Sequence, residues 1–528
     1  MGNTISIFDS TLRDGAQAHG ISFSVGDKLK IARKLDEIGV AYIEAGNPTS
    51  NPKDMEFFTR ARTELVLKNA KLCAFGSTRR PGLTVDQDPA LQALVDSGTA
   101  VTAIFGKAWD FHVLDIIRTT LDENVAMITD SISFLKDRGK EVIFDAEHFF
   151  DGYKNNPQYA LRVLSAAADA GADWLVLCDT NGGTLPLEVY QIVQSLIQQH
   201  GIGRLGIHCH NDVGTAVASS LLAVQAGALH IQGTFTGIGE RCGNANLTTI
   251  IADLQLKLGM RAIPDGNVEE LFTAYRYICE VCNIIPDERN PFVGTSAFAH
   301  KGGMHIDAVN KNPISFEHVA PESVGNERKF LMSEVAGRST ILAIIKKVDS
   351  TIGRDSEVTQ RILNKLKEKE YHGFQYEGAE HSLELLIRKE LGLFQHSFEL
   401  VEYKIIVEHD ENAKDSALAV VRIRVDGVLE EAVVSSSNGP VHALDMALRK
   451  ALCTFYDDIS NMYLLDYKVR VIDGNSATRA KVRVLIETTD GVSSWATVGV
   501  SQNIIEASWN ALIDSVEYKL LKQESCEL

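Results

Sequence analysis

The chain of 528 residues is poor in cysteine and has fewer basic than acidic residues. Its eight cysteines are thinly spread, and Cys279 and Cys282 have no second CxxC pair with which to complete a zinc knuckle. We therefore expect free thiols in a reducing compartment. Lys and Arg number 52 against 70 Asp and Glu, which gives a net charge of −18. Because this field repels nucleic-acid phosphates and anionic lipid, no nucleic-acid or membrane partner is expected.

Long apolar runs are also missing from the sequence. No run approaches the roughly 20 residues that cross a bilayer. The first ten residues, MGNTISIFDS, lack the basic and apolar regions of a secretory signal, so a cytoplasmic protein is expected. The hydrophobic share of 45% and the charged share of 23% are ordinary for a globular protein. A chain this long exceeds the ~250–300 residues of a single core, so two or more domains are expected.

Short apolar or β-branched runs alternate with amphipathic stretches of helical length over the first half of the chain. This alternation is typical of repeated βα units with a parallel sheet. The predicted strands are Ile5–Phe8, Tyr42–Ala45, Lys71–Phe75, Val101–Phe105, Val142–Ala146, Trp174–Cys178, Leu205–Cys209 and Ile231–Thr234. Eight units over ~250 residues favour a TIM (β/α)8 barrel. An open dinucleotide-binding sheet is disfavoured because TLRDGAQ, and no GxGxxG, follows the first strand.

Helices are predicted between these strands and after the last one. Gly39, Gly171 and Gly227 follow three of them, at positions suited to a helix C-terminus. The predicted helices include Lys28–Ile38, Tyr159–Ala170, Leu187–Gln199, Val213–Ala226, Val268–Val281, Gly337–Val348 and Ser356–Lys369.

We predict an α/β fold in three parts: a TIM barrel at residues 1–265, a helical linker at 266–390 and an α+β domain with an internal repeat at 391–528. The repeat rests on an offset of 64 residues. Val420–Gly427 aligns with Val484–Gly491, and Val434 aligns with Val498. One duplicated strand-turn-strand-helix unit explains these matches, while chance similarity of two amphipathic segments is the alternative.

Polar residues gather directly after the predicted barrel strands, where TIM barrels carry their chemistry. If the strands are correct, these side chains share one rim. They are Asp9, Arg13, Asp14, Gln17, Glu44, Asn47, Asp145, Glu147, His148, Asp179, Thr180, Asn181, His208, His210, Asn211, Asp212 and the loop Gly237–Asn246.

His208 and His210 form the sharpest local motif, HCH. Side chains two apart on a strand point to the same face, so two imidazoles can bind one cation. Asp14 and Asn244 are candidates to complete a mixed N/O set, which suits Zn²⁺, Mn²⁺, Co²⁺ or Mg²⁺. The alternative is a structural or solvent-facing histidine pair.

Four further residues are candidates for contact with a substrate. Arg13 beside Asp14 is either a surface ion pair or a guanidinium that stabilises an oxyanion next to a metal. Glu147 is either a simple rim carboxylate or a group that moves a proton. The hydroxyl of Thr180 either caps a turn or binds a substrate carboxylate. We assign Arg13, Gln17 and Thr180 to substrate binding.

The motifs FDSTLRDGAQ (Phe8–Gln17), HCHND (His208–Asp212) and TGIGERCGNANL (Thr236–Leu247) together resemble the DRE-TIM metallolyase superfamily, within it the 2-isopropylmalate, citramalate and homocitrate synthases. The resemblance implies a Claisen-type condensation of acetyl-CoA with a 2-oxo acid at a divalent metal. It implies that the metal ligands are Asp14, His208, His210 and Asn244. It also implies that Arg13 stabilises the oxyanion, Thr180 holds the 2-oxo acid carboxylate, Glu147 lies near the acetyl group, and His305 in FAHKGGMHIDAV (Phe298–Val309) joins the site from the linker region.

The segment Phe144–Leu161 resembles the long citramalate synthases, which take pyruvate. Bulky Phe75 and Phe105 at strand ends favour a methyl over an isopropyl group, although one methylene discriminates by only ~1–3 kcal/mol. The alternatives are a 2-isopropylmalate synthase, another 2-oxo acid acyltransferase, an acyl-CoA lyase and a catalytically silent amino-acid sensor.

The duplicated domain resembles the feedback-regulatory domain of these synthases. For a citramalate route, the resemblance implies a homodimer with isoleucine as effector. Glycine turns such as Asp426-Gly427, Asp490-Gly491 and Asn438-Gly439 are candidate binding positions, and the helical region Gly337–Lys369 is the expected link to the barrel.

Overall fold

The structure is a computed structural model that describes residues 4–330, 345, 346, 348, 352, 356–376, 378–408, 416–472, 480–491 and 493–524. The chain divides into two compact units, Met1–Phe298 with Glu317–Arg328 and Ala299–Phe316 with Lys329–Leu528. The three-part division at residues 265 and 390 stays a prediction. None of the helices in the described ranges has the length and apolar character needed to cross a membrane.

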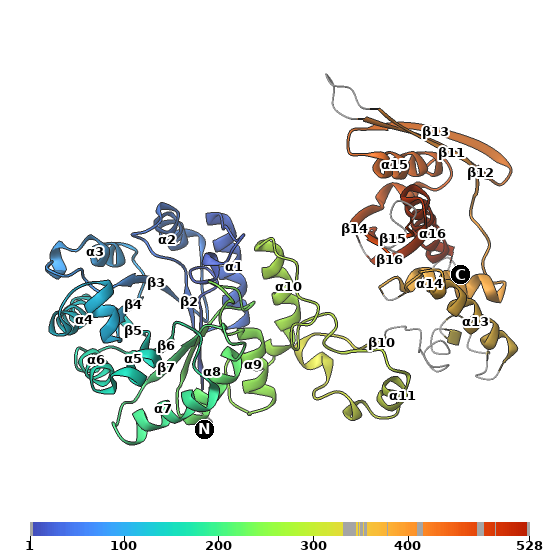
Figure 1. The fold of residues 1–528 in the computed structure, drawn as a ribbon. Coiled ribbons are helices and arrows are strands. Elements are labelled where there is room, and N and C mark those ends of the chain that lie inside the picture. Colours follow the sequence, from blue (N-terminus) through green and yellow to red (C-terminus); the bar gives the residue numbers. More distant parts are fainter. Residues whose placement is uncertain are drawn as a thin grey trace. The chain divides into compact units, whose positions relative to one another are not determined.

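The first unit contains a closed barrel of eight parallel strands in chain order, which confirms the predicted TIM fold (Figure 1). Each strand pairs with the next, and β1 closes the barrel on β8 with Ser6 opposite His230. Every strand begins and ends within two residues of its predicted limits. The strands are β1 (Ser6–Asp9), β2 (Tyr42–Glu44), β3 (Lys71–Ser77), β4 (Val101–Lys107), β5 (Glu141–Glu147), β6 (Trp174–Asp179), β7 (Leu205–Cys209) and β8 (His230–Gly233).

Helices surround the barrel and cover its apolar outer face (Figure 1). The first shows how local sequence sets the limits: Ser24 and Asp27 form a capping box, and Gly39 ends the helix at φ 93°. Gly171 and Gly227 have the positive φ predicted for them as well. The helices are α1 (Val25–Ile38), α2 (Pro52–Glu64), α3 (Pro89–Asp96), α4 (Leu121–Lys136), α5 (Phe149–Asn155), α6 (Pro157–Asp169), α7 (Pro186–Gln198), α8 (Ala216–Ala226), α9 (Leu247–Leu256) and α10 (Leu271–Val281).

The barrel interior has an apolar floor. Inward side chains of β1 to β6 form a separate core cluster of Phe8, Tyr42, Cys73, Val101, Ala103, Ile143, Val176 and Cys178. His230 lies among the rings of this cluster, with its centroid 5.4 Å from Phe8 and 5.6 Å from Tyr42. Since the floor is filled, a ligand has room only toward the carboxyl ends of the strands.

The second unit begins with a short strand pair, β9 (Ala299–His300) with β10 (Lys329–Phe330), and the helix α11 (Gly303–Lys311). It continues with α13 (Glu357–Tyr371) and α14 (Glu380–Leu391), so the helix predicted at Ser356–Lys369 is confirmed. Most of the helix predicted at Gly337–Val348 lies outside the described residues.

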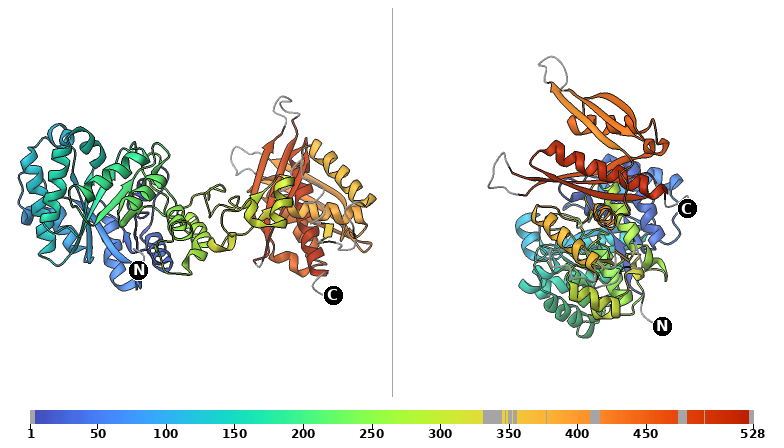
Figure 2. Two further views of the ribbon diagram at one scale, coloured as in Figure 1. Left: turned by 90° about the horizontal axis from the view of Figure 1, so that it is seen from below. Right: turned by 90° about the vertical axis from the view of Figure 1, so that its right-hand side faces the viewer.

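Two three-stranded antiparallel sheets follow, each ending in a helix, and together they confirm the predicted repeat (Figure 2). The first copy is β11 (Glu399–Glu408), β12 (Ser416–Val425), β13 (Val428–Ser436) and α15 (Pro440–Leu452); the second is β14 (Tyr463–Val471), β15 (Val482–Thr489), β16 (Ser494–Ser501) and α16 (Ile504–Glu524). Gly427 and Gly491 occupy matching turns with φ of 80° and 83°. Both copies contribute to a single core. The repeat unit predicted from the sequence did not include the leading strands β11 and β14.

Helix α14 packs against the second copy of the repeat. Its Ser382 hydroxyl accepts a hydrogen bond from the backbone N–H of Val498 at 3.0 Å, and His381 Nδ1 accepts one from Ala496 at the same distance. Because β16 is the terminal strand of its sheet, these bonds satisfy edge groups that would otherwise be open to pairing.

Candidate active site

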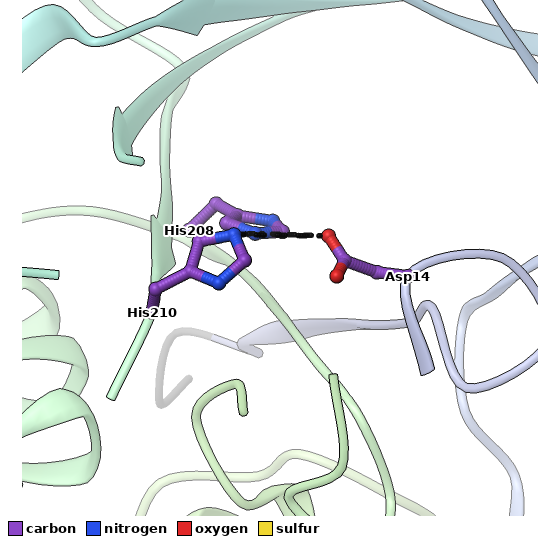
Figure 3. Close-up of side chains that lie close together, drawn as sticks. All are labelled: Asp14, His208 and His210. Atoms are coloured by element: carbon purple, nitrogen blue, oxygen red, sulfur yellow. Dashed lines mark hydrogen bonds and ion pairs between the residues drawn. The ribbon is translucent and has the colours of Figure 1, made fainter. Parts of the chain in front are cut away.

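Asp14, His208 and His210 meet at the carboxyl ends of the barrel strands (Figure 3). Asp14 comes from the loop after β1, His208 from β7, and His210 from just beyond that strand. Asp14 Oδ2 lies 3.6 Å from Nε2 of His208 and 3.8 Å from Nε2 of His210, and the two Nε2 atoms are 3.4 Å apart. Ligand atoms that share an ion at about 2.0–2.2 Å lie at such separations, so the three fit one divalent metal.

The charges of Asp14 and His210 are those that metal ligands need. Burial alone would raise the pKa of Asp14, but Arg13 and the two histidines outweigh it and hold the pKa of that carboxyl well below its usual range. Burial lowers the pKa of His210 to about 4. At neutral pH the site therefore offers an ionised carboxylate and a neutral His210 imidazole, which are the forms that bind metal.

Asn244 stands next to the triad. Its Nδ2 donates to Asp14 Oδ1 at 3.0 Å, and its Oδ1 is buried without a hydrogen-bond partner among the described residues. His210 Nδ1 is also buried without a hydrogen-bond partner among the described residues. Buried polar atoms are normally paired, so an unpaired amide oxygen beside three ligand atoms also fits a bound cation. Rotation of the Asn244 side-chain amide by half a turn would place Oδ1, in place of Nδ2, on the side of Asp14.

The glycine-rich loop Gly237–Asn246 is needed to place Asn244. A Cβ on Gly239 would lie 2.1 Å from Asn244 Nδ2, and a Cβ on Gly243 would lie 2.1 Å from the carbonyl oxygen of Gly237. Gly243 also has φ of 91°, which side-chain-bearing residues rarely adopt. These glycines therefore permit the close approach of the loop to Asp14.

Arg13 is held rigidly beside the triad. Its Nε donates to Glu44 at 2.7 Å, its Nη1 donates to Asp14 at 3.0 Å, and its guanidinium carbon lies 3.9 Å from the centroid of the Phe75 ring. Burial opposes its charge, but Glu44 and Asp14 raise the pKa of Arg13 above its usual range. Arg13 is therefore a fixed cation beside the metal ligands, and its guanidinium has further N–H groups that can donate to a ligand.

A cavity of about 270 Å³ opens above the triad. It is lined by Arg13, Asp14, Gln17, Phe75, Phe105, Asp145, Glu147, Cys178, Thr180, His208, His210 and Glu240. Thr180 Oγ1 accepts a hydrogen bond from the backbone N–H of His148 at 2.9 Å, which leaves its O–H free to donate. Glu147 forms an ion pair with Lys107. The structure brings every predicted barrel residue of the site to this one cavity except Asn244, which adjoins it through Asp14.

A second cavity of about 280 Å³ adjoins the first, because Arg13, Gln17 and Phe75 line both. Lys53 at its edge is exposed, while Lys28 and Asp54 form a buried ion pair in its wall. The pair also fixes the loop after β2, since Lys28 Nζ donates to the carbonyl of Ala45 at 2.7 Å.

His305 belongs to the other unit, so its relation to the barrel is not defined. It is an exposed residue of α11 whose ring stacks on Phe316 at 4.1 Å between centroids.

Sequence reasoning gave no role to several residues that the fold brings to the site. Glu44 is fully buried and anchors Arg13, and Lys107 neutralises Glu147. Gln232 on β8 contacts His208, and Asp145 contacts Gln232. Glu44 and Asp145 could be found by their positions at strand ends, whereas no local signal marked Gln232 or Lys107.

Comparisons with known proteins agree with this arrangement. The HMGL-like family model matches residues 4–276, the homocitrate synthase post-HMGL domain-like model residues 292–372, and the LeuA allosteric (dimerisation) domain model residues 377–520. The (R)-citramalate synthase of Aquifex aeolicus is 51% identical over 99% of both chains. That of Synechocystis sp. is 49% identical over 97% of this chain and 96% of its own. A probable 2-isopropylmalate synthase of Methanopyrus kandleri is 32% identical over 98% of both.

One family model spans more than half of the chain, and near-full-length relatives share about half of its residues. Fold, motifs and relatives lead to the same conclusion: the chain belongs to the HMGL-like family, in the DRE-TIM metallolyase superfamily.

Proposed function

We propose that the chain is an (R)-citramalate synthase, which condenses acetyl-CoA with pyruvate and water to give citramalate and CoA in isoleucine biosynthesis. The observation that carries the proposal is the near-full-length similarity to (R)-citramalate synthases at about half identity. The probable 2-isopropylmalate synthase is a more distant relative, which favours pyruvate over a bulkier 2-oxo acid.

The proposed ligands of a divalent metal are Asp14, His208, His210 and Asn244. Their donor set of carboxylate, imidazole and amide oxygen fits Zn²⁺, Mn²⁺, Co²⁺ or Mg²⁺. Such an ion, when bound, supplies Lewis-acid polarisation of the carbonyl of the 2-oxo acid.

Arg13 is proposed to donate to the carbonyl oxygen of pyruvate, since its guanidinium is already held by Glu44 and Asp14. Thr180 is proposed to donate its hydroxyl to the pyruvate carboxylate. The stacked rings of Phe75 and Phe105, with centroids 5.5 Å apart, form an apolar wall of the cavity and suit a methyl group. Together these groups orient the carbonyl carbon for attack.

The reaction needs a base that removes a methyl proton from acetyl-CoA. Glu147 in the cavity and His305 on α11 are the two candidates. The enolate carbon then forms a bond to the carbonyl carbon of pyruvate, the resulting alkoxide takes a proton, and water cleaves the citramalyl thioester to release CoA. Gln17 lies between the two cavities, and the second cavity offers space for the CoA arm.

A homodimer is proposed through the repeat domain, which matches the LeuA allosteric (dimerisation) model. Its sheets expose many large apolar side chains, and such surfaces are typical of protein interfaces. They are Val401, Ile406, Val407, Val428, Leu429, Val433, Tyr463, Leu465, Val469 and Val471.

Isoleucine is the proposed effector, as the end product of this route. Binding to the repeat domain would inhibit through different affinities for two conformations, coupled by ~1–3 kcal/mol. Isoleucine should slow the full-length protein, and deletion of everything after Leu391 should abolish that sensitivity. If isoleucine changes neither the rate nor the melting temperature of the full-length protein, regulation by isoleucine is excluded.

The substrate is tested by release of free CoA from acetyl-CoA across a panel of 2-oxo acids. Pyruvate should give the highest kcat/KM, with citramalate as the product. A higher value for 3-methyl-2-oxobutanoate would assign the chain to the 2-isopropylmalate synthases instead.

A further inference from the structure

Two buried residues, Gln232 and Asp145, form a chain of hydrogen bonds that ends on His208. Gln232 Nε2 donates to Asp145 Oδ1 at 2.9 Å, and Gln232 Oε1 lies 2.8 Å from His208 Nδ1. The three side chains come from β5, β8 and β7 and are buried at 4%, 0% and 5% relative exposure.

The geometry determines which atom of His208 carries a proton. Gln232 Nε2 donates to Asp145 Oδ1, so the amide oxygen of Gln232 is the atom that faces the imidazole. An amide oxygen only accepts, so His208 must donate through Nδ1–H. The lone pair is then on Nε2, the atom that lies 3.6 Å from Asp14 and 3.4 Å from His210.

We infer that Gln232 and Asp145 are positioning residues that fix the tautomer and the ring orientation of His208 for metal binding. The inference rests on the metal assignment proposed above. A partner on the second ring nitrogen raises the basicity of a ligating histidine and holds its ring, and loss of such partners typically costs 10–100-fold in metal affinity.

The first test measures Zn²⁺ affinity by chelator competition in the absence of substrate. Gln232→Leu removes both hydrogen bonds at similar volume and should weaken Zn²⁺ binding by about 10–100-fold. Asp145→Asn keeps an acceptor for Gln232 and should lose much less affinity than Asp145→Leu. Because no substrate is present, the result does not depend on which 2-oxo acid the enzyme uses.

His230→Phe is the matched control. His230 lies on β8 two residues before Gln232 and is equally buried, but its ring contacts Phe8, Tyr42 and Trp174. Its replacement should leave Zn²⁺ affinity unchanged. A folded Gln232→Leu protein that binds Zn²⁺ within twofold of wild type would overturn the inference.

The second test reads the tautomer directly and needs no variant. In metal-free wild-type protein labelled with ¹⁵N-histidine, His208 should show a protonated Nδ1 and a bare Nε2, while Gln232→Leu should shift it toward a mixture. A bare Nδ1 on His208 in wild type contradicts the inference even if Gln232→Leu does not fold.

Discussion

His208 and His230 both lie inside the barrel, His208 near the carboxyl ends of the strands and His230 at the amino end of β8. His208 has Gln232 on one nitrogen and Asp14 near the other. Neither nitrogen of His230 has a hydrogen-bond partner among the described residues, and aromatic rings surround it. The same residue type, at similar burial, thus binds polar groups at one end and fills an apolar floor at the other.

The interior around His230 therefore stabilises the fold, whereas the interior around His208 carries the groups proposed for catalysis. At the floor, packing of rings stabilises the interior, and a buried unpaired imidazole costs about 1–3 kcal/mol. At the other end, buried charged and polar groups are linked to one another around the cavity. Substitutions at the two ends should therefore affect different measurements.

The largest effect is expected for His208→Ala, which removes a proposed metal ligand. Bound metal should fall to background in dialysed protein, and CoA release from acetyl-CoA and pyruvate should fall with it. His230→Phe, measured in parallel, should retain both. Equal loss of metal in the two variants would show that the two ends do not differ as described.

Arg13→Lys should lower kcat by at least ~10²-fold, the size expected when one oxyanion donor is lost. Lysine keeps the charge but not the planar fork that Glu44 and Asp14 hold. Steady-state kinetics at saturating metal provide the measurement. A near-normal kcat would remove Arg13 from the chemistry.

Thr180→Val should raise the KM for pyruvate by about tenfold or more, since a hydrogen bond to a charged group contributes roughly 1.5–3 kcal/mol. Thr180→Ser keeps the hydroxyl and serves as the control. An unchanged KM in the valine variant would leave Thr180 with only its hydrogen bond from His148.

The smallest effect, on stability alone, is expected for His230→Phe. Burial and His208 lower the pKa of His230 to about 3, below the ~6.5 of an unfolded histidine. The unfolded state therefore binds more protons between these values, and wild type loses stability as pH falls below about 6.5. At pH 5 the loss is roughly 2 kcal/mol, which the phenylalanine variant should not show in urea titrations at both pH values. Parallel pH dependence in the two proteins would mean that His230 is not held neutral.

The sequence could predict the strands of the barrel, because apolar runs and helix stop signals repeat in a regular order. It could also predict that Asp14, His208 and Arg13 meet, because carboxyl ends of parallel strands share one rim. It could not predict Gln232, whose partners lie 24 and 87 residues away and whose strand carries no motif. The HCH motif distinguished His208 from His230, but the sequence could not predict that aromatic rings would surround His230.

The most direct test of the account is the dependence of citramalate formation on a divalent metal. Protein is stripped with chelator, its metal content is measured, and CoA release with pyruvate is followed before and after Zn²⁺, Mn²⁺, Co²⁺ or Mg²⁺ is added back. The account predicts no turnover in the stripped protein and recovery with at least one ion. Full turnover by protein shown to be metal-free would contradict it.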